Sequence, residues 1–251
     1  MQAFEGRIVW HELATTDQEA AKAFYTEIAP WRTEPWDVAK EYDLFKVDGR
    51  TAGGVMAIKP GATATPRWLP FVLVYDADEA ARQAVALGGA VQSGPKEIPY
   101  VGGWAIISDP QGAAIGVFEA ADKPTEHDQD PVIGEFSWHE LATDDYKAAA
   151  EFYRAMFGWE KTDEVDMGEM GPYYMFGRAG KVYGGMFKRP PDVPANFWLS
   201  YIHVGDVKLV VEQVAEFGGT VITPPVEVPG GDWVAQCIDP QGAAFALHSK
   251  K

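Results

Sequence analysis

One segment of this chain occurs twice, and that duplication constrains the fold more than any other feature. The segment WHELATTD at residues 10–17 returns as WHELATDD at 138–145, identical at seven of eight positions. A second segment, DPQGAA, occurs unchanged at 109–114 and 239–244. The offsets of 128 and 130 residues correspond to a small domain rather than to a solenoid unit. The sequence therefore predicts a tandem duplication.

The length of 251 residues fits two domains, one for each copy. We expect the first domain at 1–120 and the second at 133–251. Residues 121–132 are polar, contain two prolines and show no apolar periodicity, which is typical of a linker.

Both copies show the same order of apolar patterns. Residues 7–14 alternate like a strand, and Thr16 with Glu19 forms a predicted capping box ahead of the first helix. Short strands are predicted next at 31–38, 42–48 and 51–59, and the order then repeats with a strand at 68–75 and a helix at 77–87. We predict an α+β fold of two tandem domains. Each domain has two βαβββ modules that form a curved mixed sheet around a cleft, with the helices on the outer face.

Composition excludes several classes of function. The formal net charge of −16, without a basic run, argues against nucleic acid as a partner because phosphates repel carboxylates. Cys237 is the only cysteine, so the chain has neither a disulfide framework nor a thiolate metal site, and we expect an inert thiol. The sequence shows no secretory pattern and no apolar run of membrane-spanning length. We expect a cytoplasmic protein without membrane partners.

The repeated motifs resemble those of the vicinal-oxygen-chelate superfamily. The motifs in question are the Phe-Tyr pair in the first helix of each copy, at 24–25 and 152–153, and the DPQG segment before the last strand. That superfamily includes glyoxalase I, bleomycin-resistance proteins and extradiol dioxygenases. The resemblance implies the four-module fold, but it leaves the activity open because members of one fold perform different functions.

The resemblance also implies metal-ligand positions that this sequence does not fill. Family members with a metal place His or Glu on the first, fourth, fifth and eighth strands of a domain. The corresponding residues here are Trp10 and Trp138, Gly53-Gly54 and Gly184-Gly185, Leu69 and Leu199, and Gly116 and Ala246. None of these side chains coordinates a cation, so we expect no metal cofactor in either domain.

His11 and His139 do not restore that site, although each stands next to a glutamate. Adjacent residues of a strand point to opposite faces. If Trp10 and Glu12 face the cleft, His11 faces the helices, and the same holds in the second copy. We expect both histidines to be structural.

An alternative site for one divalent metal ion stays open in the second domain. Glu140, His203 and His248 share the cleft-facing parity on the first, fifth and eighth strands, displaced from the family's usual positions. Leu73 and Phe118 occupy the corresponding positions of the first domain, so this site would occur once.

Aromatic residues and small residues predict an apolar pocket in the cleft. The predicted ligand-binding residues are Trp10, Trp138, Tyr75, Tyr201, Trp104, Trp233 and His203. Small residues, among them Gly116 and Ala246, are expected to leave room opposite them. The alternative is that the tryptophans fill the space that a metal and its waters take in relatives.

Glu12 and Glu140 are the catalytic candidates. A carboxyl group beside an indole in a poorly solvated cleft has a raised pKa and exchanges a proton with a ligand. The alternative is a simple ion pair with a neighbour such as Arg7, Lys46, Arg178 or Lys188.

Three functions follow from these residues. The first is a metal-free protein that binds a small apolar or aromatic metabolite, with weak acid–base catalysis by a cleft glutamate. The second is a divalent-metal-dependent lyase or isomerase of glyoxalase type, acting on a dicarbonyl or a thiol adduct. The third is a non-enzymatic interaction surface with blocked clefts. We expect an intramolecular pseudo-dimer of the two domains, and thus a monomer.

Overall fold

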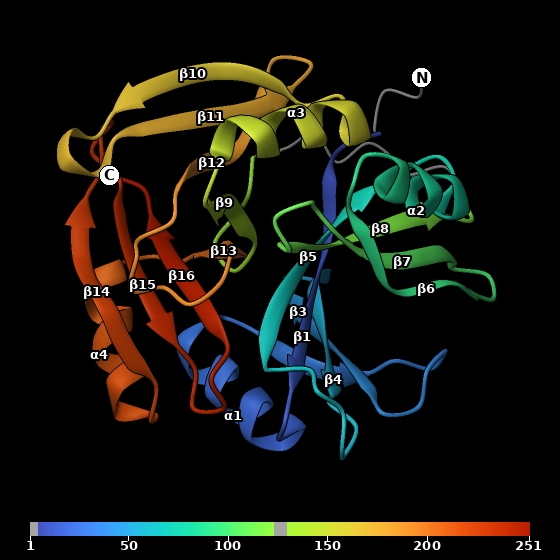
Figure 1. Cartoon of the computed structure of the whole chain (residues 1–251). Helices are drawn as coiled ribbons and strands as arrows, with labels where there is room; N and C mark the ends of the chain where they lie inside the picture. Colours follow the sequence, from blue (N-terminus) through green and yellow to red (C-terminus); the bar gives the residue numbers. More distant parts are fainter. Residues whose placement is uncertain (1–4, 123–129) are drawn as a thin grey trace. The chain divides into compact units, whose positions relative to one another are not determined.

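The computed structural model describes residues 5–122 and 130–251 (Figure 1). Most of the expected linker, 123–129, and the N-terminal residues 1–4 lie outside the described residues. The first repeat contains β1 (Ile8–Thr15), α1 (Gln18–Ile28), β2 (Arg32–Pro35), β3 (Tyr42–Val47), β4 (Arg50–Ala57), β5 (Arg67–Leu73), α2 (Ala77–Ala86), β6 (Ala90–Ile98), β7 (Gly102–Ser108) and β8 (Ala114–Ala120). The second contains β9 (Phe136–Thr143), α3 (Tyr146–Phe157), β10 (Glu160–Asp166), a short 3-10 helix (Gly168–Met170), β11 (Pro172–Arg178), β12 (Lys181–Lys188), β13 (Phe197–His203), α4 (Val207–Glu216), β14 (Thr220–Glu227), β15 (Trp233–Ile238) and β16 (Ala244–Ser249).

Each repeat forms one eight-stranded mixed sheet, as predicted. The strand orders are β2-β3-β4-β1-β5-β8-β7-β6 and β10-β11-β12-β9-β13-β16-β15-β14, so the two repeats have the same topology. In every module the first and last strands are parallel neighbours, whereas the hairpins between them are antiparallel. The α+β fold of four βαβββ modules is thereby confirmed.

Packing divides the chain into two compact units that both draw on the two repeats. One contains the described residues within 1–9, 70–128 and 139–198, and the other those within 10–69, 129–138 and 199–251. The first unit thus combines modules two and three, and the second combines modules one and four. In the second unit Phe24 of α1 packs edge-on against Phe245 of β16.

Each helix buries an apolar face against the core. Figure 1 shows α4 along β14 and β15 in the last module, orange to red, and the stripe of α4 buries Val207 and Val214. At the end of α3, Gly158 takes φ +67°, the left-handed conformation that glycine favours at a helix C-terminus.

The predicted capping box ahead of α1 is wrong. Asp17 is the N-cap, and its Oδ1 accepts a hydrogen bond from the Ala20 N–H at 3.0 Å. Asp145, Asp76 and Asp206 cap the other three helices in the same way. A short carboxylate one residue later than Thr16 satisfies the free N–H groups of the first turn, so Glu19 is not needed as the partner.

The repeated Phe-Tyr and DPQG segments bond to each other across the repeats. Tyr25 Oη donates to Asp239 Oδ2 at 3.0 Å and accepts from Trp68 Nε1 at 2.8 Å. The counterpart links Tyr153 to Asp109 at 3.2 Å, with Trp198 as the donor at 3.1 Å. Both tyrosines are fully buried. These two motifs therefore hold the core of each unit together.

No helix among the described residues is long and apolar enough to cross a membrane.

Candidate functional site

The face of β1 opposite the helices carries the residues that the sequence placed there. Trp10, Glu12 and Ala14 are half-buried, whereas His11, Leu13 and Thr15 are buried. Leu13 belongs to the core cluster that contains Phe24 and Tyr25 of α1. The predicted orientation of the first strand, with its histidine toward the helices, is therefore confirmed.

Both first-strand histidines are core residues. The ring of His11 stacks on Phe136, with centroids 3.8 Å apart. His139 Nδ1 donates to the backbone oxygen of Tyr183 at 3.2 Å. Burial lowers the pKa of His139 to about 4, which makes it neutral at physiological pH.

Glu12, on the face of β1 opposite the helices, accepts a hydrogen bond from a tyrosine. Tyr42 Oη, from the start of β3, donates to Glu12 Oε2 at 3.0 Å. The indole Nε1 of Trp10 donates to the same Tyr42 oxygen at 3.1 Å. Trp10, Tyr42 and Glu12 thus form a chain of hydrogen bonds that ends at the carboxyl group.

Burial raises the pKa of the Glu12 carboxyl above its ordinary value. The hydrogen bond from Tyr42 and the positive charge of Arg67 oppose that shift but do not cancel it. Burial also lowers the pKa of Arg67 itself, while the Glu12 charge raises it. The raised pKa that the sequence predicted for this glutamate is therefore borne out in direction, and its environment suits proton exchange.

A glycine makes the space for the tyrosine ring. Gly54 of β4 is the direct neighbour of Glu12 in the parallel pairing of β1 with β4. A Cβ atom at Gly54 would lie 2.2 Å from Tyr42 Oη, far inside van der Waals contact. The Gly-Gly sequence that stands where relatives are expected to have a metal ligand thus holds an aromatic ring against the sheet.

The second repeat builds the same arrangement. Tyr173 Oη, at the start of β11, donates to Glu140 Oε1 at 2.7 Å. Gly185 pairs with Glu140, and a Cβ atom there would lie 2.0 Å from the Tyr173 ring. We call Glu12 with Tyr42, and Glu140 with Tyr173, the two Glu–Tyr pairs.

Sequence reasoning missed the two tyrosines. Tyr42 and Tyr173 each stand three residues before a fully buried phenylalanine, Phe45 or Phe176, so an alignment of the two repeats at this point would have found them. Lys46, one of the alternative partners considered for these glutamates, donates from Nζ to Thr51 Oγ1 at 2.7 Å.

The room predicted opposite the small residues is filled. A Cβ atom at Gly116 would lie 2.2 Å from the ring of Phe71, its neighbour on β5. In the second repeat, the buried Tyr201 pairs with Ala246 in the same way. Gln236 Nε2 donates to the Tyr201 hydroxyl at 3.4 Å. The small residues therefore accommodate an aromatic ring of the neighbouring strand.

The other predicted ligand-binding aromatic residues lie in different surroundings. Trp104 is half-buried on β7 beside Phe118, with Lys96 Nζ 5.7 Å from its ring centroid. Trp233 instead packs against the core cluster, and Lys208 Nζ of α4 lies 3.5 Å from its ring. When the two repeats are aligned on their DPQG segments, the counterpart of Trp104 is Val234 and not Trp233. Because neighbouring residues of a strand point to opposite faces, Trp233 lies on the other face of its sheet. Trp138 is half-buried on β9.

His203 and His248 lie side by side in the second repeat. Their strands pair at these residues, and the ring centroids are 5.4 Å apart. His203 Nδ1 donates to the backbone oxygen of Pro131 at 3.2 Å. His248 contacts Ser137 and Asp232.

The residues do not fit the metal that the family resemblance implies. Trp10, Trp138 and the glycines of β4 and β12 offer no ligand atoms at those positions. Within residues 5–122 and 130–251, no group of three or more His, Cys, Asp or Glu side chains is arranged to hold a metal ion. Glu140 of the alternative set is instead engaged with Tyr173.

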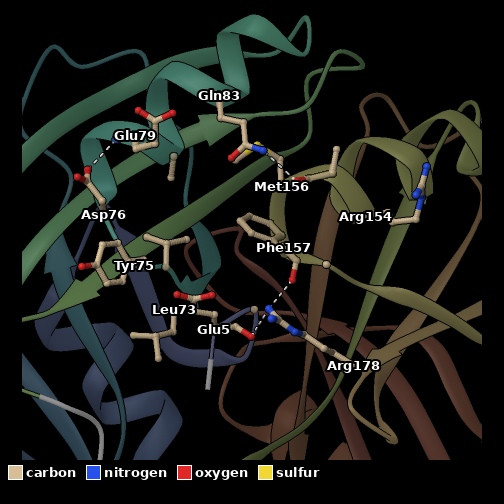
Figure 2. Close-up of a pocket in the computed structure, with 15 residues that line it drawn as sticks. Glu5, Leu73, Tyr75, Asp76, Glu79, Gln83, Arg154, Met156, Phe157 and Arg178 are labelled. Carbon is tan, nitrogen blue, oxygen red and sulfur yellow. Dashed lines mark hydrogen bonds between the residues drawn. The ribbon is translucent and has the colours of Figure 1, made fainter. Parts of the chain in front are cut away.

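A cavity of about 400 Å³ lies elsewhere, in the unit that contains α2 and α3. Figure 2 shows Tyr75, Asp76 and Glu79 on one side of it and Arg154 on the other. Tyr75, predicted as a cleft residue, is 73% exposed here. Arg178 at its base donates to the backbone oxygens of Glu5 and Phe157.

The second unit has a smaller hollow of about 250 Å³ at the corresponding place, where the end of α1 meets the loop after β13. Neither cavity is lined by Glu12 or Glu140. Both units thus have such a hollow where their paired modules meet. The two Glu–Tyr pairs are the candidate sites because each joins a half-buried carboxyl group to a tyrosine hydroxyl group.

Comparisons with known proteins agree with the fold. The model of the Glyoxalase/Bleomycin resistance protein/Dioxygenase superfamily matches residues 135–247. A Mycobacterium bovis protein named "Putative glyoxylase CFP32" is 32% identical over 254 residues, covering 97% of this chain and 94% of that protein. The Streptomyces peucetius "Anthracycline biosynthesis protein DnrV" is 28% identical over 267 residues, covering 96% and 92%.

Two solved structures show the same fold. The Mn(II)-bound glyoxalase from Novosphingobium aromaticivorans superposes with a TM-score of 0.65 at 16% identity, covering 98% of this chain and 82% of that one. The 2,2',3-trihydroxybiphenyl 1,2-dioxygenase from Sphingomonas wittichii gives 0.69 at 12% identity, covering 98% and 91%.

Proposed function

Because the chain belongs to the Glyoxalase/Bleomycin resistance protein/Dioxygenase superfamily, we propose that it binds a small apolar or aromatic metabolite without a metal ion. The two Glu–Tyr pairs supply the polar contacts. The observation that carries this proposal is the recurrence of one arrangement, a carboxyl group, a tyrosine hydroxyl and a glycine, in both repeats.

The chemistry of the pair suits a ligand with a carbonyl or phenolic oxygen. Glu12 uses Oε2 for Tyr42, and its Oε1 makes no hydrogen bond with the described residues. The raised pKa favours the protonated carboxyl group, which donates a hydrogen bond to a ligand oxygen. The same group, once ionised, accepts a proton from a ligand, which is the weak acid–base role we propose for Glu12 and Glu140.

An aromatic ligand fits the surroundings of the pair. The indole of Trp10 lies in the same hydrogen-bond chain as Tyr42 and offers an apolar surface beside the carboxyl group. A relative named for anthracycline biosynthesis supports the same class of ligand. We extend the proposal to a cytoplasmic protein, because its one cysteine is a free buried thiol. We also propose a monomer, because each compact unit already pairs modules of both repeats.

The test is a titration with a panel of aromatic ketones, quinones and phenols, followed by tryptophan fluorescence and calorimetry. We expect quenching by a subset of them. Glu12→Gln in combination with Glu140→Gln should weaken binding about fivefold, the effect of about 1 kcal/mol for one hydrogen bond. Glu160→Gln is the control for the loss of an exposed carboxylate, on β10.

If no compound of the panel quenches the fluorescence, the binding proposal is wrong and an interaction surface becomes the better account. If binding is normal in the double variant and fails in Glu160→Gln, the Glu–Tyr pairs are not the site.

A metal-dependent lyase or isomerase is the second candidate, because one relative carries the name glyoxylase. The residues at the expected metal-ligand positions have no side chains that coordinate a metal, which argues against this second candidate. We expect purified protein to contain no stoichiometric divalent ion and to bind its ligand equally after dialysis against a chelator. A stoichiometric ion whose removal abolishes turnover of a dicarbonyl would favour the second candidate instead.

A further inference from the structure

Four polar side chains gather at one place in the second repeat, apart from the Glu–Tyr pairs. Ser137 of β9, His203 of β13, His248 of β16 and Asp232, just before β15, all belong to the same compact unit. Ser137 Oγ lies 2.8 Å from His248 Nδ1. His248 Nε2 lies 3.1 Å from Asp232 Oδ2.

The fold does not require this cluster. The register of the two repeats places Val9, Leu73, Gly102 and Phe118 at the corresponding positions of the first repeat. The first repeat thus builds the same strands with three apolar side chains and a glycine. Half-buried polar groups cost free energy unless they are paired. Three of the four polar replacements bond to one another and the fourth stacks on His248, which indicates a specific role.

The hydrogen-bond partners of His248 determine which of its ring nitrogens carries the hydrogen. A carboxylate oxygen only accepts hydrogen bonds, so His248 Nε2 carries the hydrogen and donates it to Asp232. That hydrogen bond lowers the pKa of Asp232 below its usual range, which makes it an ionised acceptor. In the neutral ring Nδ1 then has a free lone pair, and it accepts the hydroxyl hydrogen of Ser137.

His203 adds a neutral neighbour. Its Nδ1 donates to the Pro131 carbonyl, so its Nε2 carries no hydrogen in the neutral ring. Burial and the neighbouring His248 lower the pKa of His203. The imidazole stacked on His248 is therefore uncharged.

The sequence of hydrogen bonds from Asp232 through His248 to Ser137 is the arrangement found around a serine that a base activates. A carboxylate orients an imidazole, and the imidazole accepts the proton of a hydroxyl group, as in serine hydrolases. The two ring nitrogens exchange roles here, because the serine lies at Nδ1 and the carboxylate at Nε2. The chemistry of proton acceptance is the same at either nitrogen.

We infer that Ser137 is a nucleophile, activated by His248 and Asp232, that accepts the acyl group of activated carboxylic esters. Ser137 Oγ attacks the ester carbonyl carbon, and its proton passes to His248 Nδ1. The bond from that carbon to the alcohol oxygen breaks, and the alcohol leaves with the proton from Nδ1. Water then attacks the acyl-serine by the same route and releases the acid, so that ester and water give acid and alcohol.

The test uses the full chain with two probes, p-nitrophenyl acetate and a fluorophosphonate. We expect slow ester hydrolysis and a fluorophosphonate adduct that peptide mass mapping assigns to Ser137. Ser137→Ala should abolish the adduct and lower hydrolysis about 100-fold, the usual scale of general base assistance. His248→Phe, which introduces the residue of the first repeat, should have a similar effect on hydrolysis.

Ser93→Ala is the matched control, because Ser93 is half-buried on β6 of the other unit. It should leave both readouts unchanged. Thermal melts and circular dichroism of each variant separate a loss of fold from a loss of chemistry. Equal hydrolysis by Ser137→Ala and Ser93→Ala, or an adduct on another residue, would overturn the inference and leave the proposed binding function untouched.

Discussion

At the scale of single residues, burial controls the charge of the candidate groups. Glu12 and His139 belong to strands of identical local sequence, yet they lie on opposite faces and titrate in opposite directions. Burial favours the neutral form of each, so the pKa of the carboxyl group rises and that of the imidazole falls. The two shifts differ in sign because the neutral form of a carboxyl group carries the proton, whereas the neutral form of an imidazole lacks it.

His139 should make the protein sensitive to acid. Its pKa of about 4 in the folded state lies below the unfolded value of 6.5, so the unfolded chain binds the proton more tightly. Stability should be complete above pH 6.5 and fall by about 3 kcal/mol as pH drops to 4. Urea unfolding between pH 4 and 7 measures the slope, and His139→Gln should flatten it. An unchanged slope in the variant would contradict this assignment.

Glu12 should have the opposite effect from His139 on the pH dependence of folding stability. Because its folded pKa is raised, the folded state holds the proton more tightly, and stability falls as pH rises from the unfolded value toward the folded one. Glu12→Gln should therefore stabilise the protein at pH 7 and leave it unchanged at pH 4. Thermal melts at both pH values test this, with Glu160→Gln as the exposed control. A loss of stability at pH 7 would show that the ionised carboxylate is favourable.

At the scale of the elements, the sequence located the helices but placed the N-cap of α1 one residue too early, and it did not reveal the side-chain contacts between strands. Gly158 and the N-cap aspartates act through local backbone geometry, in which Thr16 and Asp17 compete for the same role. The contact of Tyr42 with Glu12 joins β3 to β1 across β4 and depends on the absence of a side chain at Gly54. Such a contact requires the register of three strands.

Gly158→Ala measures the free-energy cost of placing a side chain on the left-handed residue that ends α3. The φ of +67° strains any L side chain, while the added Cβ would meet its nearest atom, in Arg178, at an ordinary 3.5 Å. We expect a loss of about 1 kcal/mol in the free energy of unfolding. Gly205→Ala is the control, since its Cβ would meet only Ile133 at 3.9 Å. Equal effects of the two substitutions on urea midpoints would refute the argument.

Gly54→Ala should damage a Glu–Tyr pair by steric displacement. The new methyl group would overlap Tyr42 Oη, and overpacking of this kind costs about 1–3 kcal/mol. The tyrosine must move away from Glu12, so ligand binding should weaken together with stability. Fluorescence titration and urea unfolding of the same sample measure both effects. Normal affinity in Gly54→Ala would show that the Tyr42 contact does not contribute to binding.

At the scale of the whole molecule, the repeat in the sequence and the unit of packing are different divisions of the chain. Each sheet comes from one repeat, whereas each compact unit combines one module of either repeat. The Tyr25–Asp239 and Tyr153–Asp109 hydrogen bonds belong to these two units and join the repeats in both. Neither repeat buries its apolar helix faces by itself.

An isolated repeat should therefore not be a stable monomer. Residues 1–125 alone would leave Phe24 and Tyr25 without the Phe245 ring that covers them. We expect this fragment to aggregate or to dimerise, and to form a one-to-one complex when co-expressed with residues 126–251. Size-exclusion chromatography with light scattering distinguishes these outcomes. A folded monomeric fragment would contradict the dependence of each core on both repeats.

The sequence by itself determined the duplication, the four modules, the face of the first strand and the direction of the Glu12 pKa, because repeats and alternating polarity act locally along the chain. Only the tertiary structure decided which tyrosine bonds each glutamate, that aromatic rings fill the space over the small residues, and that Ser137 and Asp232 meet at His248. Those contacts join residues far apart in the chain, and a shift of one residue, as at Trp233, moves a side chain to the other face.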